Sequence, residues 1–258
     1  MPSNYAHYRF GGLVLDKLNA DTRRPIQRFR RVFDVGLHGP DLFFYYNPFW
    51  KNPVGQLGSD FHKKTGREFF TAACAALKAA PSEMGTVYLY GLLGHYCLDA
   101  GCHPYIIEKS NAGLVRHAEL ETDFDRHLLR QDGKVPPHLQ CFNTHMHLTR
   151  GECVTVSQFF PPVTPAQVNT SIRNMATHTK LLSHKKRNLL EAILKLTNEN
   201  VQDHVMHTKA NPRCEAMHPE LMVLYNGAVE RYACLLEQLT AHMEQGTPLG
   251  EDFDPIFG

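Results

Sequence analysis

Histidines and carboxylates spaced four residues apart mark one stretch of the chain as a candidate metal site. Residues 91–106 read GLLGHYCLDAGCHPYI and place His95, Asp99 and His103 at successive steps of four. In a helix, side chains at i and i+4 lie above one another on one face, with Cβ atoms about 5–6 Å apart. A line of imidazole, carboxylate and imidazole on one helix face therefore offers nitrogen and oxygen ligands suited to zinc.

A second pair with the same spacing, His117 and Glu121, begins fourteen residues after His103. One such pair is more often a surface ion pair or a buried, hydrogen-bonded histidine. Two pairs within 27 residues instead favour a polynuclear metal site, provided that both helices direct their side chains into one space. In such a site Asp99, flanked by a histidine on either side, is the natural bridge between ions.

The composition narrows the class of protein. The 258 residues carry a net charge of +1, so we expect no stable nucleic-acid partner. Sixteen histidines are an excess that indicates metal binding, proton chemistry or a solvated surface. No apolar run is long enough to span a membrane, and the start MPSNYAHYRF lacks the pattern of a secretory signal, so we expect a cytoplasmic protein. The sequence gives no indication of the oligomeric state.

The seven cysteines are scattered and include no C-x-x-C pair. In a cytosolic protein they are expected to be reduced and mostly buried. Cys97 and Cys102 lie inside the histidine-rich stretch and could approach a metal, but the histidine and carboxylate series fills the site without them.

Helical periodicity and capping residues predict an all-α fold, with seven or eight helices in one domain spanning residues 1–258. Pro104 removes a backbone donor and disfavours helical geometry at His103, so the central helix is predicted to end there. Asn111 is a plausible cap for the helix of the second pair. The expected helices cover residues 5–20, 24–35, 60–80, 84–103, a segment ending near Leu129, 164–183, 184–206 and 219–245. Residues 131–163 are expected to form a loop, either a surface excursion or a flap over the site, and the C-terminal tail is expected to be extended.

The segment 36–50 is rich in glycine, proline and aromatic residues, which exclude a regular helix through 36–41. It is expected to be an ordered loop that delivers Asp41. Two interpretations remain open: the aromatic side chains wall a pocket beside Asp41, or they belong to the core and Asp41 is a turn residue after Pro40.

Several motifs occur in a specific order over the first half of the chain. They are YAH at 5–7, HGPD at 38–41, FH at 61–62, GHxxxDxxxHP at 94–104 and HxxxExxxD at 117–125. This ordered set resembles the zinc-dependent phospholipase C family, whose all-helical fold is shared with fungal and plant single-strand nucleases and holds three zinc ions. The helices after residue 164 match that family only in being helical.

The resemblance implies a set of metal ligands. A second, more open zinc would be held by His103, His117 and Glu121, and a third by His7 and the bridging Asp99. Secreted members complete the third site with a mature N-terminal tryptophan, which this chain lacks, so its missing ligands would come from Met1 or nearby backbone, from substrate, or not at all. The ligands implied for the first zinc are Asp41, His62, His95 and Asp99.

The chemistry implied by the resemblance is hydrolysis of a phosphate ester at two or three zinc ions, or other divalent metals. Asp41 is the candidate catalytic residue, since it could orient or deprotonate the attacking water. His38 could contact phosphate or only support the turn, and Asp125 is expected to orient a neighbouring ligand. His145 and His147 form a weaker candidate for a metal pair in a loop.

Three functions are consistent with these residues. The first is a phospholipase C-like hydrolase whose partner is a phosphate-ester small molecule or a phospholipid head group. The aromatic run 43–50 would suit contact with lipid or with a choline-like cation. The second is a nuclease or nucleotidase in which the same aromatic rings stack on bases. The third is a metal-binding protein without catalysis.

Overall fold

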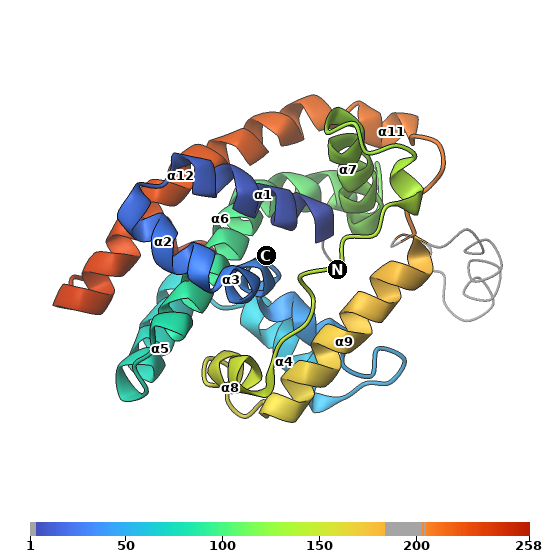
Figure 1. The fold of residues 1–258 in the computed structure, drawn as a ribbon. Coiled ribbons are helices and arrows are strands. Elements are labelled where there is room, and N and C mark those ends of the chain that lie inside the picture. The colour runs from blue at the N-terminus through green and yellow to red at the C-terminus, as the bar shows by residue number, and fades with distance from the viewer. Residues whose placement is uncertain (1–3, 184–202, 204) are drawn as a thin grey trace.

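The computed structural model describes residues 4–183, 203 and 205–258, and these residues fold into helices joined by loops (Figure 1). The prediction of an all-α fold of the phospholipase C and single-strand nuclease type is confirmed, because the described residues contain no strand beyond an isolated bridge between Thr65 and Ile256. The helices and 3₁₀ segments are α1 (Asn4–Lys17), α2 (Ala20–Arg28), α3 (Arg30–Gly36), η1 (Gly39–Tyr45), α4 (Pro53–His62), α5 (Gly66–Ala79), α6 (Glu83–Asn111), α7 (His117–Gln131), η2 (Pro137–Leu139), α8 (Arg150–Ser157), α9 (Pro165–Leu182), α11 (Pro212–Glu215), α12 (His218–Gln245) and η4 (Glu251–Phe253).

Helix α6 runs through the middle of the molecule, between α1, α3, α7 and α12 (Figure 1). Every residue from Val87 to Asp99 is buried, as expected for a helix that is covered on all sides. Small residues allow the closest of these contacts. A Cβ atom on Gly36 would lie 2.7 Å from the Tyr88 carbonyl oxygen, and one on Gly91 would overlap the Phe33 carbonyl, so glycine at both positions lets α3 and α6 touch through their backbones.

The prediction that Pro104 ends the central helix is wrong, because α6 continues through Pro104 to Asn111. A proline inside a helix costs about 3 kcal/mol through a lost hydrogen bond and a steric clash. Burial of Cys102, His103 and Ile106 on either side of the proline opposes this cost. His103 therefore stays on the same helix face as Asp99. Asn111 ends α6 rather than capping the next helix.

Two other predicted helices are each divided in two. The segment 24–35 belongs to α2 and α3, which meet at Phe29, where the backbone leaves helical geometry with ψ at 35°. Pro25 lies inside α2. The segment 60–80 belongs to α4 and α5, separated by a capping box between Thr65 and Glu68 that starts a new helix. His62 is consequently the last residue of α4 and not the start of a longer helix.

The predicted loop 131–163 is divided: residues 131–136 are exposed, whereas from His145 onward the segment contributes buried side chains to the core. A capping box between Thr149 and Glu152 starts α8, which the sequence prediction missed. Phe159 and Phe160 after this helix are buried. The C-terminal tail also folds back onto the molecule, since Phe253 and Phe257 are buried and the Phe257 amide donates to the Lys64 carbonyl oxygen.

The remaining helix predictions have different outcomes. The segments 164–183 and 219–245 are confirmed as α9 and α12. The prediction for 184–206 lies almost entirely outside the described residues. Buried hydrophobic side chains from α1 to Phe257 form a continuous cluster, and the division of the chain into one domain stays a prediction. Within the described part of the chain, no helix has both the length and the apolar character needed to cross a membrane.

Candidate metal centre

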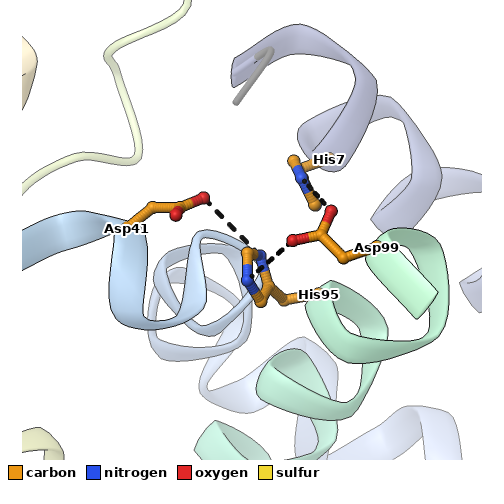
Figure 2. Close-up of side chains that lie close together, drawn as sticks. All are labelled: His7, Asp41, His95 and Asp99. Atoms are coloured by element: carbon orange, nitrogen blue, oxygen red, sulfur yellow. Dashed lines mark ion pairs between the residues drawn. The ribbon is translucent and has the colours of Figure 1, made fainter. Parts of the chain in front are cut away.

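The histidine and carboxylate side chains singled out in the sequence come together in two groups beside α6. Within each group, one ligand atom from every residue lies within 4.8 Å of the others. The first group takes residues from α1, η1 and α6, namely His7, Asp41, His95 and Asp99 (Figure 2). The second takes residues from α6 and α7, namely His103, His117 and Glu121.

Asp99 is the centre of the first group and contacts three histidines. Its two oxygens lie 3.2 Å from His7 Nε2 and 3.1 Å from His95 Nε2, on opposite sides of the carboxylate (Figure 2). The Asp99 oxygen near His7 also lies 3.6 Å from His103 Nε2, which belongs to the second group. Asp99 therefore connects the two groups, in the position of a bridging carboxylate.

The backbone at Gly39 brings Asp41 against His95. Gly39 has a positive φ of 47° and lies so close to the His95 ring that a Cβ atom there would overlap it. The 3₁₀ turn that follows carries Asp41, whose Oδ2 is 3.9 Å from His95 Nδ1 (Figure 2). Residues 36–41, whose glycine and proline content disfavours a regular α-helix, thus place Asp41 in the core.

Asp125 positions His7 through the backbone of α1. Its carboxylate accepts hydrogen bonds from the amides of Tyr5 at 2.9 Å and Ala6 at 2.7 Å, in the first turn of that helix. A carboxylate is favoured at a helix N-terminus, where amides lack partners in the helix and the dipole is positive. Because Asp125 lies one turn after Glu121 on α7, it joins the helix of the second group to the helix that carries His7.

The second group is centred on Glu121. Its Oε1 lies 3.1 Å from His103 Nε2 and 3.0 Å from His117 Nε2. The His117 side chain is 35% exposed, whereas His95 is 0% exposed, so the second group is the more open of the two. A cavity of about 20 Å³, large enough for one water molecule, is lined by residues of both groups.

His62 stands beside the first group and faces Asp41. Its Nδ1 is 2.7 Å from the Gly58 carbonyl oxygen, to which it can only donate. In a neutral ring Nε2 then carries a lone pair, and it points at Asp41 Oδ1 across 2.9 Å. Two acceptors at this distance need a proton or a metal ion between them. A backbone carbonyl that fixes the second ring nitrogen is the usual support of a histidine ligand.

Burial and neighbouring charges shift the pKa values of the groups. Burial lowers the pKa of His95 to about 4, so its ring is neutral and able to ligate at pH 7. Burial alone would raise the pKa of Asp99, but His103, His95 and His7 hold it well below its ordinary value. Burial likewise opposes protonation of His103, yet Asp99 and Glu121 raise the pKa of His103 to about 9. The carboxylates therefore attract a positive charge into a buried site.

Unsatisfied polar atoms show that the residues present fit a metal ion. Buried nitrogen and oxygen atoms without a hydrogen-bond partner in the described structure gather in these two groups. Such atoms are costly unless a ligand satisfies them, and zinc is bound in proteins through carboxylate oxygens and through one nitrogen of a neutral imidazole ring. They are His7 Nδ1, Asp41 Oδ2, both ring nitrogens of His95, Asp99 Oδ2, His103 Nδ1 and Glu121 Oε2.

The other candidate histidines have partners elsewhere. His38 Nε2 lies 2.8 Å from His145 Nε2, both rings are buried, and the two stack at an interplanar angle of 13°. His147 contacts Arg31 Nη1 at 3.0 Å, so the predicted pair of His145 and His147 points to two different neighbours. Neither Cys97, which donates to the Ala228 carbonyl, nor Cys102 belongs to a ligand group.

The aromatic side chains of residues 43–50 neither all wall a pocket beside Asp41 nor all belong to the core. Phe43 and Tyr45 are buried in the core, whereas Phe44 stacks on His62 with ring centroids 5.3 Å apart. Phe49 and Trp50 are exposed to solvent. This segment therefore contributes side chains to the core, one ring that contacts the site, and an exposed loop.

The tail of the chain also reaches the site, which sequence reasoning missed. The Phe257 ring lies 6.2 Å from His95, and the Gly258 amide donates to the His62 carbonyl oxygen at 3.2 Å. The only signal in the sequence was the pair Phe253 and Phe257, four residues apart in an otherwise acidic tail.

Comparison with known proteins agrees with this geometry. A family model described as zinc dependent phospholipase C matches residues 6–222, a range that includes both ligand groups and His62. No curated protein and no solved structure matches the chain significantly.

Proposed function

Because that match covers most of its length, the chain belongs to the zinc-dependent phospholipase C family, and on this premise we propose that it is a zinc-dependent hydrolase of phosphate esters, with phospholipid head groups as its substrate class. The observation that carries the proposal is the junction of two ligand groups at Asp99, whose carboxylate lies 3.1 to 3.6 Å from three histidines. A phosphate ester needs positive charge on several oxygens at once, which two adjacent ions supply.

We assign one ion to each group. His7, Asp41, His95 and Asp99, with His62 beside Asp41, would hold the first, and His103, His117 and Glu121 would hold the second. Bound zinc would supply Lewis acidity toward the phosphate oxygens and lower the pKa of water. A third ion is not required by the ligand groups of the described residues.

Asp41 is the proposed general base. Its Oδ2 is buried and lacks a hydrogen-bond partner among the described residues, and a carboxylate that binds the ion through one oxygen keeps the other to accept a proton from the attacking water. His62, on the other side of the same carboxylate, keeps Asp41 oriented at 2.9 Å. The half-exposed His117 lies on the side where a substrate can approach, while the buried first group excludes bulk water from the reacting atoms.

The test begins with metal content. Protein purified without added metal should contain about two zinc ions per chain by elemental analysis. The Asp99→Asn variant should contain fewer, and Asp254→Asn, which changes an exposed carboxylate paired with Arg67, should match the unmodified protein. Less than one ion per chain in the unmodified protein would contradict the metal centre.

Activity is then measured with a phosphocholine diester, a generic phosphodiester and single-stranded DNA in parallel. The proposal predicts the fastest turnover with the first. A preference for DNA would replace it with a nuclease function on the same fold. No turnover of any substrate by fully zinc-loaded protein would indicate a metal-binding protein without catalysis.

A further inference from the structure

Two adjacent aromatic side chains project into solvent from the loop between η1 and α4. Phe49 is 73% exposed and Trp50 is 72% exposed, and they are the only exposed phenylalanine, tyrosine or tryptophan side chains among the described residues. The other exposed large hydrophobic residues are aliphatic and lie singly along the described chain, which is ordinary for a protein surface. The two rings pack edge to face, with centroids 6.1 Å apart, so they form one apolar tip.

Hydrogen bonds hold the loop in an ordered shape. The Asn52 side-chain amide donates to the carbonyl oxygens of Tyr46 at 2.8 Å and Trp50 at 2.9 Å. Its side-chain oxygen accepts from the Gly55 amide at 2.8 Å and caps α4. The tip is therefore presented by a fixed scaffold, and a partner that binds it meets a smaller entropic cost of ordering.

The surroundings of the tip are nearly free of charge. From residue 42 to residue 59, Lys51 is the only Asp, Glu, Lys, Arg or His, in a chain of which 21% is charged. Aromatic rings beside a basic residue are typical of protein segments at a membrane–water interface, where the rings lie at the level of the head groups. The absence of a carboxylate from this segment removes the repulsion that anionic lipids would otherwise exert.

The loop is joined rigidly to the metal centre. It connects η1, which carries Asp41, to α4, which ends at His62. The two elements are in close contact, since a Cβ atom on Gly58 of α4 would lie 3.2 Å from the Pro40 carbonyl oxygen and 3.3 Å from Phe43 Cβ. From the start of α4 to His62 the helix rises about 14 Å. Figure 1 shows the loop extending beyond α4, away from the centre of the fold.

We propose that Phe49 and Trp50 insert into the interface of a phospholipid bilayer and hold the metal centre at the membrane surface. The inference deepens the proposed function and rests on it, since it assumes that the substrate lies in a membrane. A bilayer is favoured over a protein groove because the tip is convex, aromatic and flanked by a lysine. Burial of the two rings at the interface favours binding. The ordered loop then holds Asp41 and His62 at a fixed distance from the membrane surface.

The chain contains a single tryptophan, so its fluorescence reports directly on this loop. Zinc-loaded protein is titrated with unilamellar phosphatidylcholine vesicles, and the proposal predicts a blue shift of the emission together with quenching by brominated lipid. In a sedimentation assay, Phe49→Ser/Trp50→Ser should partition at least about tenfold more weakly, given the apolar area of two rings. The control is Val223→Ser, which removes a 65% exposed aliphatic side chain from α12 and should leave partitioning unchanged.

Activity separates this inference from the proposed function. The double variant should retain its turnover of a short-chain, monomeric phosphocholine diester and lose turnover of the vesicular substrate. Vesicle binding without hydrolysis of any ester would contradict the proposed function and still support the docking tip. No blue shift and no sedimentation with vesicles would overturn the inference. A blue shift that follows protein concentration without lipid would also overturn it, in favour of self-association through the tip.

Discussion

The two ligand groups share α6 and Asp99 but differ in how the chain assembles them. The first draws on positions 7, 41, 95 and 99, from three segments, and its side chains are at most 4% exposed. The second draws on two consecutive helices, and its His117 side chain is 35% exposed. We infer that the first group is part of the hydrophobic core, so that its ion also contributes to folding, whereas the second group is an open site whose ion serves mainly the reaction.

Replacement of the residue that both groups share should have the largest effect. Asp99→Asn keeps the shape of the side chain and removes its negative charge. We expect the hydrolytic activity to fall by more than about 100-fold, since even changes outside the ligand shell cost 10- to 100-fold. Zinc content and turnover are measured together, with Asp254→Asn as the control. Full zinc content and activity in Asp99→Asn would show that the two groups are independent.

The difference in burial should appear in the free energy of unfolding. His95→Ala removes a fully buried ring from the core and should destabilise the zinc-loaded protein by about 2–4 kcal/mol. His117→Ala, at a partly exposed position, should cost less than about 1 kcal/mol while lowering the zinc content by one ion. Urea denaturation measures both. Equal destabilisation by the two substitutions would contradict the distinction between a core site and an open site.

The metal-free protein should lose stability between about pH 6.5 and pH 9, whereas the zinc-bound protein should not show this loss. Asp99 and Glu121 raise the pKa of His103 to about 9 in the fold. A raised pKa stabilises the metal-free protein fully below about pH 6.5, and this contribution, about 3 kcal/mol, is lost as the pH rises to 9. With zinc bound, His103 has no proton to lose. Thermal unfolding with and without a chelator measures the difference, and identical pH profiles would contradict it.

The smallest effect on metal binding is expected at Asp125, which acts through the backbone of α1. Asp125→Asn weakens two hydrogen bonds to the Tyr5 and Ala6 amides and removes a favourable charge from the helix N-terminus. We expect a loss of about 1–2 kcal/mol in stability and weaker zinc binding in the first group alone. Unfolding and zinc titration of the two sites measure this. Weakened binding in the second group would show that Asp125 acts on Glu121 instead.

Residue spacing predicts the second ligand group but not the first. The second group could be read from spacing, because His117 and Glu121 lie four apart on one helix and His103 is on the preceding helix. The first group could not be assembled in this way, since nothing local connects His7 with Asp41 or either with α6. The resemblance to a family brings Asp41 together with His95 and Asp99 but assigns His7 to a third ion, whereas the structure places His7 in the first group. The sequence does not distinguish a site residue from a turn residue at Asp41, and the contact that resolves its position is with His95, 54 residues away.

The all-α fold and the line of ligands on α6 could be predicted from the sequence, because helix geometry is local and places residues i and i+4 on one face. The tertiary structure alone sets which histidines meet which carboxylates. It also decided that α6 passes through Pro104, that His38 pairs with His145, and that the tail reaches His62. These arrangements depend on burial summed over the whole core. That sum can outweigh the local cost of a proline, and no local pattern in the sequence records it.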